Sequence, residues 1–298
     1  MHNLESTNLG TKNSHQVVEE ILSSIGELAA MPQVVYKVIE LTATTNTSAQ
    51  EIENAISIDP GFSSKVLILV NSAFYALPRK VTSIREAATF LGYKTIRQLA
   101  LTVGVFDMFV GKNDIGSLRR RTWWRHSVDA AVCARSIAQH LMIMNQEDAY
   151  SCGLLHDIGK SLMDRYNSEL YVDVEKLIEE GYDNIIAEQQ VFGCTHEEVG
   201  KAAALNWHLP AILCESIGAH HSGKFEENPE SVALTSLASD YAHAILSGRK
   251  TETDEELQKE LLIGKPWALE ILKIQSSDSE KLYQVCKHSL SEKTALSA

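Results

Sequence analysis

The chain has 298 residues and a formal net charge of -12 at neutral pH, which argues against general affinity for nucleic acid, because phosphate binding depends on Lys and Arg to displace counterions. No apolar run approaches the roughly 20 residues that a membrane-spanning helix needs, and the polar start lacks the apolar core of a signal peptide. The five cysteines include no C-x-x-C pair, so we expect reduced thiols in a cytoplasmic protein with neither a membrane nor a nucleic acid as partner.

Helices are expected throughout, because apolar residues recur mainly at intervals of three and four and only six prolines interrupt the chain. The sequence therefore predicts an all-α fold, a compact multi-helix bundle built from two helical halves. Residues 1–13 are polar and aperiodic and predict a disordered tail. The first helical half is predicted over residues 14–110.

Helix start signals repeat within this first half. Capping boxes, in which a hydroxyl and a glutamate satisfy each other's free backbone amides, begin at Ser48 and Ser83. Asp59 stands before a proline and predicts an N-cap. Gly92 is the predicted C-cap of the helix that begins at Ser83.

A stretch rich in Gly, Asn and Asp between residues 110 and 117 is the predicted boundary of the halves. The second half, residues 118–247, has start signals at Thr195, Pro210 and Pro229. It opens with a basic cluster beside two tryptophans, which we interpret as a solvated, ion-paired helix start. The cluster consists of Arg119, Arg120, Arg121 and Arg125. Residues 250–298 predict a C-terminal helical extension.

The stretch GLLHDIGK, residues 153–160, holds the residues best suited to chemistry. Adjacent helical residues diverge by about 100°, so the imidazole of His156 and the carboxylate of Asp157 can reach one ion, while Lys160 lies one turn further on. One helix face would then offer a nitrogen ligand, an oxygen ligand and a cation for a phosphate. A His-Asp pair alone is weak evidence, because pairs of this size occur by chance.

Further polar residues on predicted helices have two interpretations each. Asp240 points where apolar residues point, and a buried carboxylate needs a metal ion or a hydrogen-bonded core partner. His126 fits an internal helix as a core residue or as a ligand, and His196 fits a helix start. His220 and His221 also suit the C-terminal dipole of their helix.

The order of these residues resembles the ligand set of the HD superfamily of metal-dependent phosphohydrolases and of its HD-GYP branch, which hydrolyses cyclic di-GMP. The implied metal ligands are His126, His156, Asp157, His196, His220, His221 and Asp240. The resemblance implies one or two divalent transition ions (Fe, Mn, Ni, Co or Zn) bridged by Asp157, a bridging hydroxide that attacks phosphorus, and Lys160 as a catalytic residue beside Asp157.

The surrounding sequence is similar to another branch of this superfamily. ELAAMPQVVYKVIEL, IDPGFSSKVLILVNSAFYALPRKVTSIREAATFLG and LRRRTWWRHSVDAAVCA resemble the HDOD domain, the HD-related output domain of bacterial signalling proteins, and the similarity runs over residues 20–247. HDOD proteins are all-helical and are generally regarded as regulators that have lost HD catalysis. The Gly-Tyr-Pro element of the HD-GYP branch is absent after His221, which argues against cyclic di-GMP hydrolysis.

Two functions follow from these resemblances. The first is a signalling module that binds other signalling proteins and retains an HD-type metal site. The second is a metal-dependent phosphohydrolase or phosphodiesterase that acts on a nucleotide or another phosphoester. The aromatic residues of NSAFYAL and the pair Met108 and Phe109 predict either a partner surface or core packing.

Overall fold

The computed structural model describes residues 13–26, 31–43, 46–72, 75, 77–110, 114–247 and 265–296. Every regular element in these ranges is a helix, and none is a strand, so the all-α prediction is confirmed. The predicted disordered tail lies outside the described residues except for Asn13, and so does the part of the C-terminal extension before residue 265. No helix of the described ranges has the length and apolar character needed to cross a membrane.

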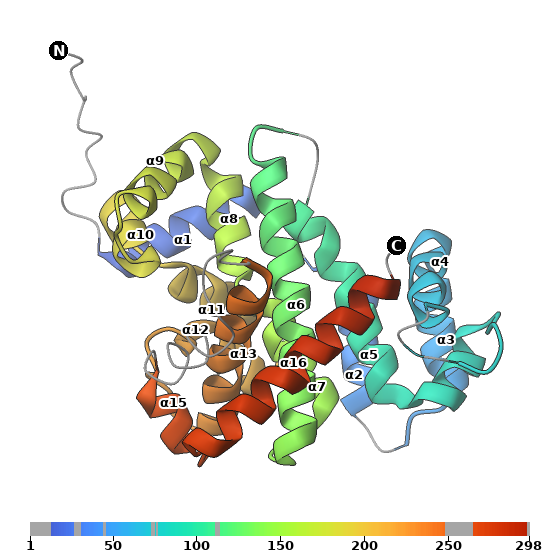
Figure 1. The fold of residues 1–298 in the computed structure, drawn as a ribbon. Coiled ribbons are helices and arrows are strands. Elements are labelled where there is room, and N and C mark those ends of the chain that lie inside the picture. Colours follow the sequence, from blue (N-terminus) through green and yellow to red (C-terminus); the bar gives the residue numbers. More distant parts are fainter. Residues whose placement is uncertain are drawn as a thin grey trace.

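Most helices are short and follow one another closely along the chain (Figure 1). Before residue 111 they are α1 (Ser14–Ile25), α2 (Gln33–Ala43), α3 (Ala49–Ser57), α4 (Pro60–Val70) and α5 (Ile84–Val110). After it they are α6 (Ser117–Leu141), α7 (Gln146–Leu155), α8 (Ile158–Tyr166), α9 (Ser168–Glu179), α10 (Asn184–Phe192), α11 (His196–Asn206), α12 (Ala211–Ala219), α13 (Pro229–Ser247), α15 (Pro266–Ile271) and α16 (Ser276–Leu296). The longer helices are α5, α6, α13 and α16.

Local start signals explain where several helices begin. Ser48 and Thr195 form complete capping boxes at α3 and α11, and the Asp59 carboxylate accepts the backbone N–H of Phe62 at 3.0 Å to cap α4. These side chains satisfy amides that have no partner inside the first turn. The three start predictions are confirmed.

The predicted capping box at Ser83 forms only in part. Its hydroxyl accepts the Glu86 backbone N–H at 3.1 Å, but the Glu86 carboxylate accepts the N–H of Thr82 instead. Gly92 has a φ of +79° and a ψ of 163°, and α5 consists of two helices that meet at this kink. The prediction that the helix beginning at Ser83 ends at Gly92 is therefore supported, and a second helix follows directly.

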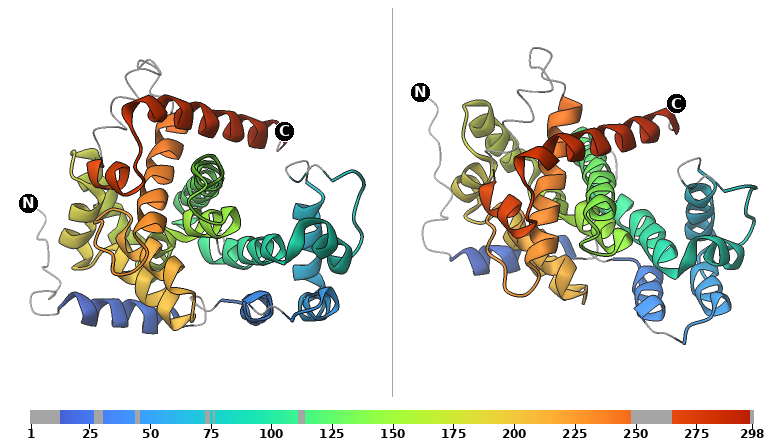
Figure 2. Two further views of the ribbon diagram at one scale, coloured as in Figure 1. Left: turned by 90° about the horizontal axis from the view of Figure 1, so that it is seen from below. Right: turned by 60° about the horizontal axis from the view of Figure 1, so that its bottom comes forward.

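The long helix α6 runs through the middle of the molecule and contacts α7, α13 and α16 (Figure 1). Helices α2 to α5 gather at one end, and α8 to α13 lie towards the other (Figure 2). Helix α1 is the exception among the first helices, since it packs against α8 and α11. One apolar cluster runs continuously from Val17 on α1 to Leu290 on α16. The two sets of helices therefore share a core.

The basic cluster is partly buried, contrary to its interpretation as a solvated helix start. Arg120 is 1% exposed, and its guanidinium binds Asp164 at 2.5 Å and Asp114 at 2.6 Å. Arg119 contacts Asp164 at 3.2 Å and Glu175 at 2.6 Å. The ion pairing of the arginines was predicted correctly. The burial of Arg120 was not predicted, because it results from the buried carboxylate of Asp164 on α8, which requires cationic partners.

Of the two interpretations of Met108 and Phe109, a partner surface or core packing, the structure supports core packing. Met108 and Phe109 are buried, and the Phe109 ring packs against Trp124 with ring centroids 5.4 Å apart. The core interpretation therefore holds for this pair. Phe74 in NSAFYAL lies outside the described residues.

Because Arg120 is buried against Asp164, we expect Asp164→Ala to lower the free energy of unfolding by about 3–5 kcal/mol, since it leaves a buried guanidinium short of a carboxylate. Urea denaturation followed by circular dichroism measures this loss. The matched control is Glu40→Ala, which breaks an exposed pair with Lys37 and should cost less than about 1 kcal/mol. Equal losses in the two variants would contradict the importance of the buried pair.

Candidate metal centre

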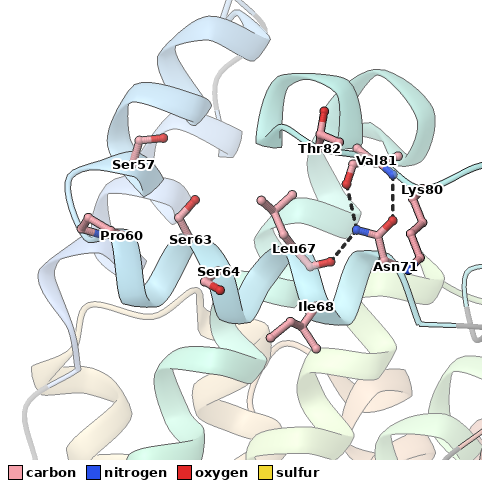
Figure 3. Close-up of a pocket in the computed structure, with 10 residues that line it drawn as sticks. All are labelled: Ser57, Pro60, Ser63, Ser64, Leu67, Ile68, Asn71, Lys80, Val81 and Thr82. Carbon is pink, nitrogen blue, oxygen red and sulfur yellow. Dashed lines mark hydrogen bonds between the residues drawn. The ribbon is translucent and has the colours of Figure 1, made fainter.

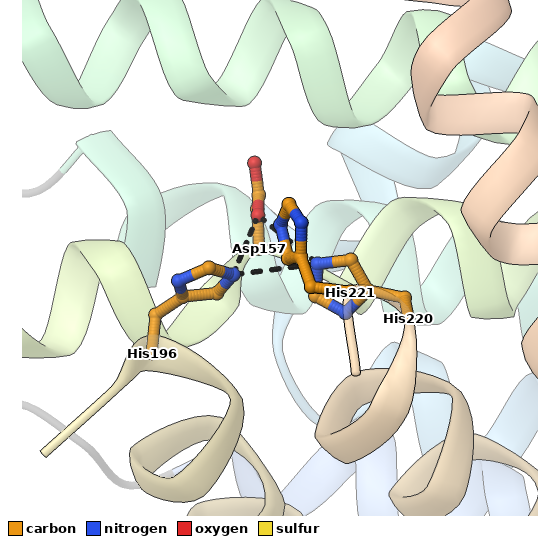
Figure 4. Close-up of side chains that lie close together, drawn as sticks. All are labelled: Asp157, His196, His220 and His221. Carbon is orange, nitrogen blue, oxygen red and sulfur yellow. Dashed lines mark hydrogen bonds and ion pairs between the residues drawn. The ribbon is translucent and has the colours of Figure 1, made fainter. Parts of the chain in front are cut away.

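Four helix ends converge on one carboxylate. His156 follows α7 and Asp157 precedes α8, while His196 is the first residue of α11 and His220 follows α12. Figure 4 shows the rings of His196 and His220 directed toward the side chain of Asp157. The prediction that His156, Asp157 and Lys160 lie on one continuous helix is wrong, because α7 ends and α8 begins at the His-Asp pair.

Two glycines of GLLHDIGK allow this convergence. A Cβ atom at Gly159 would lie 2.0 Å from the backbone carbonyl oxygen of His196, and one at Gly153 would lie 2.7 Å from Cα of Ala131. Real Cβ atoms do not approach other atoms this closely. Helix α8 therefore touches the start of α11, and α7 touches α6, because glycine stands at both contacts.

The two carboxylate oxygens of Asp157 face different groups. Its Oδ1 lies 3.4 Å from Nε2 of His196 and 3.6 Å from Nε2 of His220. Its Oδ2 lies 2.8 Å from the Lys160 ammonium, 3.4 Å from Nε2 of His156 and 3.8 Å from Nε2 of His126.

Six of the seven residues that the HD resemblance implies as metal ligands thus come together. They form two groups that share Asp157, and within each group the potential ligand atoms lie within 4.8 Å of one another. The groups are Asp157 with His196, His220 and His221, and Asp157 with His126 and His156.

Hydrogen bonds define which ring nitrogen of each central histidine is available. Nδ1 of His156 lies 2.7 Å from the carbonyl oxygen of Gly153, and Nδ1 of His220 lies 3.0 Å from that of Ile217. Because a carbonyl oxygen only accepts, the single proton of each neutral ring is assigned to Nδ1. The lone pair on Nε2 of His156 then faces Asp157, and that of His220 faces both Asp157 and Nε2 of His196, which is 3.3 Å away. Metal coordination requires such a lone pair.

The third imidazole is oriented by a buried carboxylate that the sequence had not marked. Glu188 on α10 accepts from Nδ1 of His196 at 2.7 Å and from its backbone N–H at 2.8 Å. The Tyr171 hydroxyl donates to the other oxygen of Glu188 at 2.9 Å. A carboxylate behind a histidine is the usual support of a metal ligand. In the sequence, the signal for Glu188 was an acidic residue next to Ala187 and close to Phe192, two apolar residues that are buried in α10.

The protonation states also suit a cation. Burial favours the neutral acid, but the nearby His156 and Lys160 outweigh it and hold the pKa of Asp157 well below its usual range. Burial lowers the pKa of His220 well below its usual range and that of His126 to about 3. An ionised carboxylate therefore lies beside the neutral imidazoles of His220 and His126, and the neutral ring is the form that binds metal.

Two atoms at the centre lack any hydrogen-bond partner although they are buried, namely Nε2 of His156 and Oδ1 of Asp157. Orphaned buried acceptors cost free energy unless an unseen partner satisfies them. A divalent transition ion accepts electron pairs from both atom types. The residues present therefore fit such an ion.

The seventh residue implied as a ligand, Asp240, lies outside the two groups, and His126 has a further contact of its own. Asp240 on α13 is outside both groups, its side chain is 31% exposed, and it binds the ammonium of Lys265 at 3.1 Å. Burial raises its pKa. The expectation that this carboxylate needs a partner is supported, and the partner in the structure is a lysine. His126 lies on α6 and its Nε2 is 3.1 Å from the Ser239 hydroxyl.

A separate cavity of about 630 Å³ lies along α4 and the segment before α5 (Figure 3). Its lining includes the hydroxyl residues Ser57, Ser63 and Ser64 together with Lys80. It shares no residue with the metal cluster. The cavity therefore has no part in coordination.

The fold and the cluster define an all-helical domain of the HD type, with a His/Asp centre assembled from helix ends. The family model of the HDOD domain matches residues 28–223. The chain belongs to this family.

Solved structures agree on the fold. An HDOD domain protein of unknown function from Geobacter sulfurreducens is 24% identical, with a TM-score of 0.72 over 93% of this chain and 98% of that one. A candidate phosphohydrolase from Shewanella amazonensis SB2B is 22% identical, with a TM-score of 0.69 over 90% and 96%. A candidate signal transduction protein from Marinobacter aquaeolei VT8 is 16% identical, with a TM-score of 0.61 over 92% and 64%.

Curated relatives are longer than this chain. An uncharacterized protein of Treponema pallidum is 23% identical over 211 residues, which cover 70% of this chain and 40% of that protein. The chain spans less than half the length of the curated relatives it matches.

Because Glu188 orients His196, we expect Glu188→Ala to lower the affinity for Mn²⁺ by about 10–100-fold while the protein stays folded. Isothermal titration of metal-stripped protein measures the affinity, and circular dichroism checks the fold. Glu180→Ala, at an exposed position after α9, is the matched control and should bind like the wild type. An unchanged affinity in Glu188→Ala would remove the assigned role.

Proposed function

We propose that this chain is a regulatory HDOD protein of bacterial signal transduction that retains an HD-type site for divalent transition metal. The observation that carries the proposal is the buried Asp157 carboxylate, whose Oδ1 has no hydrogen-bond partner while the Nε2 atoms of His196 and His220 face it. This arrangement is unfavourable without a cation and favourable with one.

The proposed ligands form two sets that share Asp157. One set consists of Asp157, His196, His220 and His221, and the other of His126, His156 and Asp157. The resemblance to the HD superfamily adds Asp240 to the second set. Bound Fe, Mn, Ni, Co or Zn would supply Lewis-acid polarisation of an oxygen ligand. Glu188 orients one imidazole, and backbone carbonyls orient two others.

Burial of the centre favours regulation over catalysis. His156, Asp157, His196 and His220 are buried, and Lys160 is already bound to Asp157 at 2.8 Å. Membership of the HDOD family implies an output domain of a signalling protein, and the element that defines cyclic di-GMP hydrolases is absent after His221. A metal ion here would stabilise or report the arrangement of α7, α8, α11 and α12, and signalling proteins are the proposed partners.

The second candidate is a metal-dependent phosphohydrolase, and the placement of Lys160 favours it. Its ammonium lies beside Asp157 and is partly exposed, as are His126 and His221. One side of the cluster is thus within reach of solvent, and a cation there suits the charge that develops on a transferring phosphoryl group. The substrate in this case would be a nucleotide or another phosphoester.

Metal analysis tests the site itself. We expect untagged protein from cells grown with added iron or manganese to contain bound transition metal, and His220→Ala to lose most of it, because one imidazole ligand is removed. Plasma mass spectrometry of desalted protein measures the content. His140→Ala, exposed in the last turn of α6, is the control. Metal at background level in wild-type protein would count against the proposal.

A hydrolysis screen separates the two functions. Metal-loaded protein is tested on phosphomonoesters, nucleotides and cyclic dinucleotides beside a folded Asp157→Ala variant. Regulation predicts no turnover above that variant. Turnover that disappears in Asp157→Ala and falls in Lys160→Met would establish the phosphohydrolase instead, because both substitutions remove groups at the centre.

A further inference from the structure

The two candidate ion positions differ in how far their ligands are already engaged. On the side of Asp157 Oδ1, the oxygen has no hydrogen-bond partner, and Nε2 atoms of His196 and His220 lie at 3.4 and 3.6 Å. On the opposite side, Oδ2 holds the Lys160 ammonium at 2.8 Å. In the first position the Nε2 atoms of His196 and His220 lie 3.3 Å from each other and face no cation of the described residues. The second position begins with a competing cation.

Nε2 of His156 in the second position has no hydrogen-bond partner, but two other ligands proposed for this position are engaged. Nε2 of His126 pairs with the Ser239 hydroxyl at 3.1 Å. The Asp240 carboxylate pairs with the Lys265 ammonium at 3.1 Å. An ion entering beside His156 would have to displace these contacts, and displacing an ammonium from a carboxylate means separating opposite charges in a partly buried place.

Lys265 is held in position by packing and is not a freely moving surface lysine. Its side chain is 15% exposed, and its ammonium also lies 3.5 Å from the carbonyl oxygen of His220. It directly precedes α15, which packs against α13, the helix that carries Asp240. The Trp267 ring lies so close to Gly223 that a Cβ atom there would be 2.9 Å from it.

The contact belongs to a part of the chain beyond the matched HDOD region. The family model ends at residue 223, whereas Asp240 and Lys265 both follow it. In the sequence the two residues are 25 positions apart. The lysine is thus a feature of the C-terminal segment of this chain that reaches the rim of the cluster.

We propose that Lys265 is a tethered cation that competes with metal for Asp240 and so keeps the second ion position empty in the resting protein. This inference rests on the proposed metal site. The first ion binds Asp157 Oδ1, His196, His220 and His221, and the second binds only where Lys265 gives up the Asp240 carboxylate. The C-terminal segment thereby sets the number of ions that the centre holds.

Titration of metal-stripped full-length protein with Mn²⁺, followed by calorimetry, tests the proposal. We expect wild-type protein to bind one ion tightly and a second ion weakly, and Lys265→Met to bind the second ion about tenfold more tightly, because the competing charge is gone. Lys265→Arg keeps the charge and should bind like the wild type. Lys265→Gln provides a second neutral variant if Lys265→Met disturbs the fold.

Two controls assign the effect to Asp240. Lys273→Met removes an exposed lysine just after α15 and should change neither ion. Adding Asp240→Asn to Lys265→Met should abolish the gain, because the freed carboxylate is lost.

The possible outcomes separate the two proposals. One tight ion in the wild type with an unchanged second ion in both neutral variants would overturn the role of Lys265 and leave the metal site intact. An absence of any binding in all variants would overturn both.

Discussion

The structure is organised around a carboxylate that stays ionised after it is buried. Removing an isolated charge from water is so costly that a protein neutralises it or surrounds it with compensating groups. Here Asp157 is 1% exposed, and the surrounding groups are imidazoles and one lysine. Each central imidazole is itself oriented from behind, by a backbone carbonyl or by Glu188. The neighbouring helices can therefore be understood as the support of one negative charge.

Helix ends provide much of this support. The amino ends of α8 and α11 lie at Asp157 and His196, and helix amino ends carry partial positive charge. Asp157 stands at the N-cap position of α8 yet makes no capping hydrogen bond with its side chain, so its carboxylate is left for the imidazoles. Further along α8, the buried Asp164 binds Arg119 and Arg120 of α6. Helix α8 is thus anchored both at its start and near its end.

The sequence predicted what depends on local pattern and missed what depends on depth or on distant contacts. The helices and the N-caps at Ser48, Asp59 and Thr195 could be predicted because a few neighbouring residues determine them. The break at Asp157 was not, because the apolar spacing continues across it. The burial of Arg120 follows from Asp164, 44 positions away. The grouping of the histidines was predicted from the family resemblance alone. No sequence pattern indicated that Lys265, which directly precedes α15, contacts Asp240.

The two glycines of GLLHDIGK have a consequence for how such a motif is used to infer function. Gly153 and Gly159 are required by contacts between backbones, whereas His156 and Asp157 would be required by the proposed binding of metal. The first requirement holds whether or not the centre binds an ion, because the helices have to touch in either case. Within these eight residues, the glycines that the fold requires are therefore distinct from the side chains that metal chemistry would require. When function is transferred between members of such a family, only the donor side chains carry information about metal.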